Sequence, residues 1–229
     1  MTKAGSPAAL AALLSFNGGY VDTAGFLGLH GLFTAHVTGN FVTLAAALVE
    51  GSHGIIGKLI ALPEFIIVIA LARLAGTALR RAGAPVLPIL LSTKVVLLAA
   101  FFALAVMFGP FADPDSPAAL LTGFAGIAAM AMQNAVHRVH LADLPPTTLM
   151  TGSTTQATLD AVDLAIGAAA DPGALHSRFG RLGVSILCFA GGCAISALLY
   201  WLVGFWCLAM PVIVGALAAL LTVKAAPAQ

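Results

Sequence analysis

A short pattern of polar residues occurs twice in this chain, within stretches that are otherwise apolar. With identical spacing, its two copies are Thr34, Thr38, Gly39 and Asn40, and Thr147, Thr151, Gly152 and Ser153. A short apolar segment that we predict to be helical follows each copy. Polar groups at membrane depth are costly unless they line a cavity. The repeated pattern therefore predicts a site made of two parts, one from each half of the chain.

The chemistry of this site would come from the amino ends of the two short helices. The first turn of a helix has unpaired backbone N–H groups and the positive end of the helix dipole. Two such ends that face each other favour an anion or a polar neutral solute. The threonine hydroxyls and the Asn40 amide are suited to contact that solute and equally suited to cap the helices. His36, two residues before Thr38, is placed to sense pH near the site.

Asp22 is the strongest single candidate for a residue that couples solute movement to a proton or a cation. It lies in the first apolar segment, shortly after Asn17 and a pair of glycines. A carboxylate in such a place must pair, bind a cation or take up a proton. The alternative is a structural acid that pairs with a neighbouring donor or lies close enough to the surface to reach water.

Gln133 and Asn134 are adjacent polar residues in a later apolar segment. Neighbours on a helix point about 100° apart, so we expect only one of them to face a site. Amides in membrane helices also serve as contacts between helices. Taken together, the predicted substrate site consists of polar and glycine residues from both halves: Asn17, Asp22, His36, Thr38, Gly39, Asn40, Gln133, Asn134, Thr151 and Gly152.

We predict neither a metal site nor an enzyme active site. His137 and His140 are three residues apart, but no glutamate completes a zinc spacing. Asp160 and Asp163 share a helical face and either bind a cation or pair with Arg178 or Arg181 at the cytoplasmic surface. The chain has no Ser/His/Asp constellation, nucleotide-binding loop or haem motif. No catalytic residue and no cofactor is therefore predicted.

The composition points to a lipid environment. The chain is 60% hydrophobic and 8% charged, with a mean hydropathy of +1.03, whereas soluble domains carry about 25% charged residues. A net charge of +1 argues against a nucleic-acid partner. We therefore expect a multi-pass protein whose main partner is the lipid bilayer.

The apolar segments predict an all-α architecture. A membrane span needs about 20 mostly apolar residues. Segments near that length are 8–29, 56–79, 86–109, 118–138, 180–200 and 202–223. Two shorter or more polar segments, 38–50 and 151–169, follow the polar pattern. We predict that these two are re-entrant or short half-helices.

The loop charges favour this topology. Basic residues mark cytoplasmic loops. If every segment crossed with Lys3 inside, Arg80 and Arg81 would lie outside. If the two short segments instead enter and leave by the same face, all the basic loops fall inside, together with Lys224. The loop 113–115 then falls outside.

Each half then crosses the membrane three times, which makes the halves inverted repeats. Their bounds are about 8–112 and 116–224, within a single integral membrane domain over residues 1–229. Inverted repeats with broken helices at the midplane are a recurring plan of transporters and some channels. Both termini are expected in the cytoplasm, and the location is the inner (plasma) membrane.

Several of these residues also carry a resemblance to a known family. The blocks are residues 19–22, 25–26, 33, 35–36, 38–40, 133–134, 147–148 and 151–152, and the first is the sequence Gly-Tyr-Val-Asp. They resemble the YoaK-like family, bacterial membrane proteins with a domain of unknown function. The family's pattern has a glycine just before the Gln-Asn pair, where this chain has Ala131 and Met132. The resemblance implies an integral inner-membrane protein and names no substrate.

The sequence thus predicts a polytopic helix bundle with six spans, two half-helices and a polar site at the membrane centre. We expect it to be a small-solute transporter or channel, with the solute unidentified. The alternative is a non-transporting sensory or assembly partner in the membrane, for which Asp22→Asn would alter folding or association with no flux to lose. Small residues on the helices also make a homo-oligomer plausible.

Overall fold

The chain is helical throughout the part that the structure describes. The computed structural model describes residues 7–225. The helices are α1 (Pro7–Gly28), α2 (Gly39–Glu50), α3 (Ile55–Arg81), α4 (Val86–Phe108), α5 (Pro117–His140), α6 (Met150–Ala165), α7 (Pro172–Val203), the 3-10 helix η1 (Gly204–Leu208) and α8 (Ala209–Ala225). No strand occurs in residues 7–225, in agreement with the predicted all-α fold.

Four helical stretches are long and apolar enough to cross a membrane. They are α3, α4, α5 and Pro172–Val223, in which α7, η1 and α8 follow one another without a break. The protein is therefore an integral membrane protein, as its composition predicts. α1 is as long as a span, but Asn17, Asp22 and several glycines lower its hydropathy. The two polar-pattern segments form α2 and α6, the shorter helices after the two loops.

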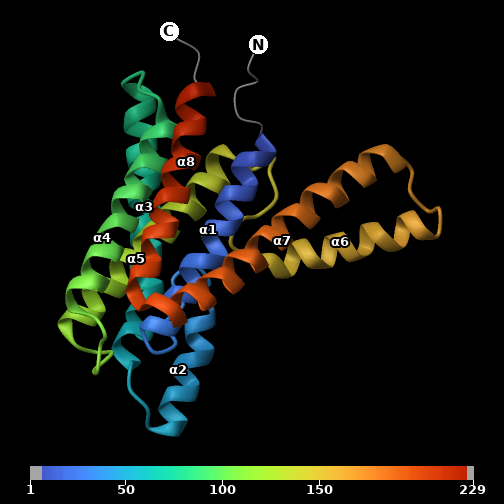
Figure 1. The fold of residues 1–229 in the computed structure, drawn as a ribbon. Helices are drawn as coiled ribbons and strands as arrows, with labels where there is room; N and C mark the ends of the chain where they lie inside the picture. The colour runs from blue at the N-terminus through green and yellow to red at the C-terminus, as the bar shows by residue number, and fades with distance from the viewer. Residues whose placement is uncertain (1–6, 226–229) are drawn as a thin grey trace.

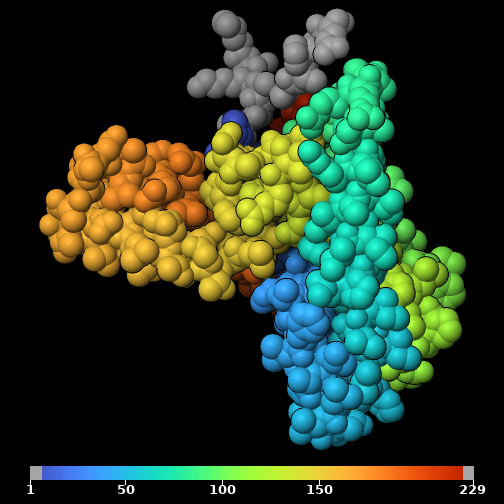
Figure 2. Space-filling model, turned by 180° about the vertical axis from the view of Figure 1, so that it is seen from behind, coloured from blue at the N-terminus to red at the C-terminus, as the bar shows by residue number. Residues whose placement is uncertain are grey.

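The long helices form a bundle from which two parts project (Figure 1). α4 packs on α5 and α8, α3 packs on α5, and α1 packs mainly on α7. α6 and the first half of α7 form a hairpin that extends away from the bundle, and α2 extends from its lower end in Figure 1. Of the helices, α2 contacts α3 alone and α6 contacts α7 alone. From behind, a recess separates this hairpin from α2 (Figure 2).

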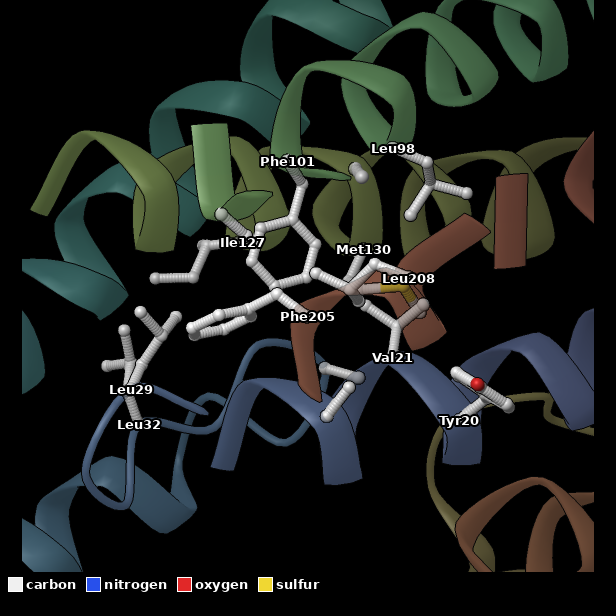
Figure 3. Packing of buried hydrophobic residues seen from close by; sticks show 14 of the residues in the cluster. Tyr20, Val21, Leu29, Leu32, Leu98, Phe101, Ile127, Met130, Phe205 and Leu208 are labelled. Carbon is white, nitrogen blue, oxygen red and sulfur yellow. The ribbon is translucent and has the colours of Figure 1, made fainter. Parts of the chain in front are cut away.

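The main core joins the two halves of the chain around large apolar side chains. Phe101 of α4 is fully buried, as are Met130 of α5 and Leu208 of η1. These side chains converge with Val21 of α1 (Figure 3). The neighbouring Tyr20 donates its hydroxyl proton to the carbonyl oxygen of Cys207 at 2.8 Å. This core fixes the position of α1, and with it the position of Asp22.

The contact between α1 and α7 depends on glycines. A Cβ at Gly192 would stand 2.2 Å from the carbonyl oxygen of Phe16, and one at Gly19 would stand 2.2 Å from that of Phe189. The two backbones therefore touch directly. One turn further along α7, the hydroxyl of Ser196 donates to the Tyr20 carbonyl oxygen at 2.8 Å. Small residues permit this kind of close helix approach in membranes.

Gly192→Ala is expected to lower the free energy of unfolding by about 1–3 kcal/mol, because the added methyl group forces the two backbones apart. Gly191→Ala is the matched control, since nothing lies within 4 Å of a Cβ at that position. Gly191→Ala should therefore leave stability unchanged or raise it by up to about 1 kcal/mol, because alanine has the higher helix propensity. Denaturant titration of both variants in the same detergent measures the difference, and equal losses would contradict the close contact.

Candidate functional site

The carboxylate of Asp22 holds the loop that carries the first polar copy. Its Oδ1 atom accepts hydrogen bonds from the backbone N–H groups of Thr34 at 2.8 Å, Ala35 at 2.7 Å and His36 at 3.3 Å. Successive N–H groups of this kind form a concave binding surface for an anion. The side chain is only 7% exposed. The predicted coupling residue is therefore also the anchor of this loop.

The other oxygen of the same carboxylate remains available to a ligand. Oδ2 accepts no hydrogen bond from the described part of the chain. Asp22 lines a hollow of about 400 Å³, which we call the α1–α6 hollow. Its polar lining comes from α1, the two polar-pattern loops, the start of α6 and α7: Asp22, Thr23, His36, Thr148, Thr151 and Cys193. Both halves of the chain thus contribute to one hollow.

The amino end of α6 presents free donors at this hollow. No side chain caps the helix. The backbone N–H groups of Met150, Thr151 and Gly152 donate no hydrogen bond within residues 7–225. Met150 and Thr151 line the α1–α6 hollow. Because unpaired N–H groups and the helix dipole both favour negative charge, this end is suited to an anionic or acceptor group.

The amino end of α2 differs, because its donors are already used. The N–H groups of Gly39, Asn40 and Phe41 donate to carbonyl oxygens in the preceding turn at 2.8, 3.1 and 3.2 Å. No side chain caps this helix either. Asn40 instead ties the loop together, since its amide both accepts from the Phe33 N–H and donates to the Phe33 carbonyl oxygen, each at 2.9 Å. The two helices begin with the same polar pattern, but the first N–H groups of α2 are hydrogen-bonded and those of α6 have no acceptor in the described residues.

The second polar loop is held by the adjacent amides of α5. Gln133 Nε2 donates to Thr147 Oγ1 at 3.0 Å and to the Leu14 carbonyl oxygen at 2.9 Å. Asn134 Oδ1 accepts from the hydroxyl of Thr148 at 2.8 Å. Both side chains therefore reach the loop, although we expected only one to face a site. They position the loop from outside the α1–α6 hollow.

A buried lysine that the sequence reasoning missed completes this network. Lys94 of α4 is 1% exposed, and its Nζ donates to Gln133 Oε1 at 2.5 Å. In the sequence Lys94 is a lone basic residue in the middle of the apolar segment 86–109. The topology argument considered only the charges in loops and so did not include it. Charged groups inside membrane helices are rare and mark functional positions. Lys94, Gln133 and Thr147 form one polar chain across three elements.

Comparison with known proteins identifies the family. The family model DUF1275, described as a protein of unknown function, matches residues 10–221. The chain belongs to the DUF1275 family. No curated protein and no solved structure matches the chain. The family match agrees with the resemblance in the sequence and spans both loops, so the α1–α6 hollow lies in the part of the chain that defines DUF1275.

In this DUF1275 protein, the structure brings Asp22, His36 and Thr151 of the predicted site into the α1–α6 hollow. The remaining predicted residues are not part of its lining: Asn17, Thr38, Gly39, Asn40, Gln133, Asn134 and Gly152. Asn17 is fully buried and donates to the Pro211 carbonyl oxygen at 2.8 Å, while its Oδ1 has no partner in the described chain. Of these seven residues, Asn40, Gln133 and Asn134 hold the two polar-pattern loops.

Asp160 is held by an ion pair between α6 and α7. Arg178 donates to its two carboxylate oxygens at 2.6 and 2.9 Å, and Gln156 donates to it at 2.7 Å. Of the two readings of the Asp160–Asp163 pair, the structure supports pairing with Arg178. Within residues 7–225, no group of three or more His, Cys, Asp or Glu side chains is arranged to hold a metal ion.

Asp22→Ala is expected to destabilise the protein by about 1–3 kcal/mol, because the buried N–H groups of the loop lose their acceptor. Asp22→Asn should cost less, since an amide oxygen still accepts those bonds. The exposed Asp143 provides the control Asp143→Ala. Thermal unfolding in detergent measures all three, and an Asp22→Ala variant as stable as the control would refute the anchoring role.

Gln133→Leu is expected to destabilise by about 3 kcal/mol, because it leaves the Lys94 ammonium buried without an acceptor. Adding Lys94→Met should restore part of that loss, since both polar partners are then gone. A double-mutant cycle from chemical denaturation should give a coupling energy of about 0.5–3 kcal/mol. Strictly additive effects would show that the two side chains do not depend on each other.

Proposed function

We propose that this DUF1275 protein is a transporter or channel, and not an enzyme, that moves a small solute through the α1–α6 hollow. One observation carries the proposal. Two loops with the same polar pattern, one from each half, meet at a buried carboxylate that keeps one oxygen free. Carboxylates inside membrane helices mark substrate and ion pathways. A mostly apolar hollow with a few convergent polar groups is the usual form of a small-molecule site.

The packing of the helices supports an inverted repeat. In such a repeat α1 corresponds to α5, α2 to α6, α3 to α7 and α4 to α8. The observed packing of α1 on α7 then has its counterpart in the packing of α5 on α3. The contact of α2 with α3 likewise corresponds to that of α6 with α7. α1 and α5 run in opposite directions through the bundle (Figure 1). Asp22 and Asn134, on these two helices, each hold the polar loop of their own half.

The lengths of the short helices support six crossings. α2 has 12 residues and α6 has 16. At 1.5 Å per residue they extend about 18 and about 24 Å, whereas the hydrocarbon core is about 30 Å thick. We propose that neither crosses and that α1, α3, α4, α5, α7 and the continuous stretch of η1 and α8 do.

The charges at the helix ends support a cytoplasmic location for both termini. The ends of α3 and α5 carry Arg80, Arg81 and Arg138 and lie toward the end of the bundle where α1 starts and α8 finishes (Figure 1). The loop with Asp113 and Asp115 lies at the opposite end. Basic residues collect on the cytoplasmic side, which is the inner face of the plasma membrane in this proposal. Lys3, part of the same prediction, lies outside the described residues.

This orientation predicts which positions react with a membrane-impermeant thiol reagent. In a background without the three native cysteines, Arg80→Cys should react only from the cytoplasmic side. Ser52→Cys and Asp113→Cys should react only from the other side. Labelling of intact cells and of inverted vesicles measures both. Reaction of position 80 from outside alone would overturn the topology.

The transport proposal is tested with purified protein in liposomes. Small anions, amines and metabolites are screened for uptake with and without a pH gradient, with protein-free liposomes as the control. We expect protein-dependent flux of at least one solute that Asp22→Asn reduces about tenfold or more, the loss of one charge-assisted contact. No flux, combined with Asp22→Asn effects confined to association with another protein, would favour the membrane assembly partner instead.

A further inference from the structure

The α1–α6 hollow offers two opposite electrostatic ends to one ligand. Asp22 Oδ2 has no hydrogen-bond partner in the described chain, although the residue is more than nine-tenths buried. A free carboxylate oxygen requires a donor and is best satisfied by a cation. The N–H groups of Met150 and Thr151 at the start of α6 likewise donate to no acceptor within residues 7–225, and they require one, best an anion.

Neither end by itself identifies the ligand. An anion alone would meet the negative Asp22, and a cation alone would meet the positive end of α6. A solute that carries both a positive group and a negative group satisfies both ends of the α1–α6 hollow at once.

The rest of the lining selects an apolar body. The rings of Phe26 and Phe33 lie 4.8 Å apart, and that of His36 lies 5.6 Å from Phe33. Phe189 of α7 lines the hollow as well. Aromatic faces accept apolar groups and also attract an ammonium group. At about 400 Å³ the hollow is at the small end of ligand pockets, which start at about 300 Å³.

We infer that the α1–α6 hollow binds a small apolar α-amino acid in its zwitterionic form. The ammonium group bonds to Asp22 Oδ2, the carboxylate accepts from the backbone N–H groups at the start of α6, and the side chain lies against Phe26 and Phe33. This inference rests on the proposed function for the identity of the site and adds the class of solute.

The test is a binding experiment on the purified full-length protein in detergent. Isothermal calorimetry compares leucine with 3-methylbutylamine, which lacks its carboxylate, and with 4-methylpentanoate, which lacks its amino group. We expect leucine to bind at least about tenfold more tightly than either fragment, because each charge-assisted contact contributes about that factor. No binding of leucine, or a fragment that binds as tightly, would overturn the inference.

Two variants assign the ends of the ligand. Asp22→Asn, which still offers an acceptor to the loop, should weaken leucine and the amine and spare 4-methylpentanoate. Met150→Pro removes one donor at a first-turn position that tolerates proline, and the extended Leu149 before it is compatible with one. It should weaken leucine and the carboxylate and spare the amine, relative to the side-chain control Met150→Ala. Reversed or identical patterns would refute the assignment.

Binding and transport give separable results. Leucine binding with no flux of any screened solute in liposomes would support the solute class and overturn the transport proposal. Flux of another solute by a protein that does not bind leucine would overturn the solute class and leave transport standing.

Discussion

The site depends on one interaction, the capture of three successive backbone N–H groups by a single oxygen of Asp22. In the proposed topology this irregular loop lies at membrane depth, where its N–H groups need partners because lipid offers none. Asp22 supplies one acceptor for three of them, and its second oxygen accepts no hydrogen bond from the described residues. The same carboxylate thus satisfies the N–H groups of the loop and offers an oxygen to a ligand. Its bonds to the loop hold it in the lining of the hollow.

The second half meets the same requirement with uncharged groups. Asn134 and Gln133 position the loop 141–149 through hydroxyls of Thr148 and Thr147 instead of its backbone N–H groups. The amino end of α6 therefore stays open, whereas that of α2 closes on its own preceding turn. The two loops share one polar sequence pattern, and the difference between their anchoring residues gives the hollow one negative and one positive end.

Hydropathy predicted the positions of the helices, and the repeated polar pattern predicted where the two short helices begin. The apolar segments correspond to the helices, since burial in lipid leaves a continuous signal in the sequence, and Thr38-Gly39 and Thr151-Gly152 mark the starts of the two short helices. The partners of Asp22 were not predictable, because they are backbone groups whose identity depends on the path of a loop. Lys94 was overlooked, and its contact with Gln133 needs the packing of α4 on α5. The phenylalanines of the hollow gave no signal in a chain that is apolar nearly everywhere.

α6 rests on no helix other than α7, and α7 crosses α1 where neither Gly19 nor Gly192 has a side chain. The α6 wall of the hollow is therefore attached to the bundle through α7 alone, and α7 packs on α1 through direct backbone contact at these two glycines. Asp22 and its loop belong to the other side of that crossing. A change in the angle between α7 and α1 would therefore move α6 relative to Asp22 and leave intact the hydrogen bonds that the loop makes to that carboxylate.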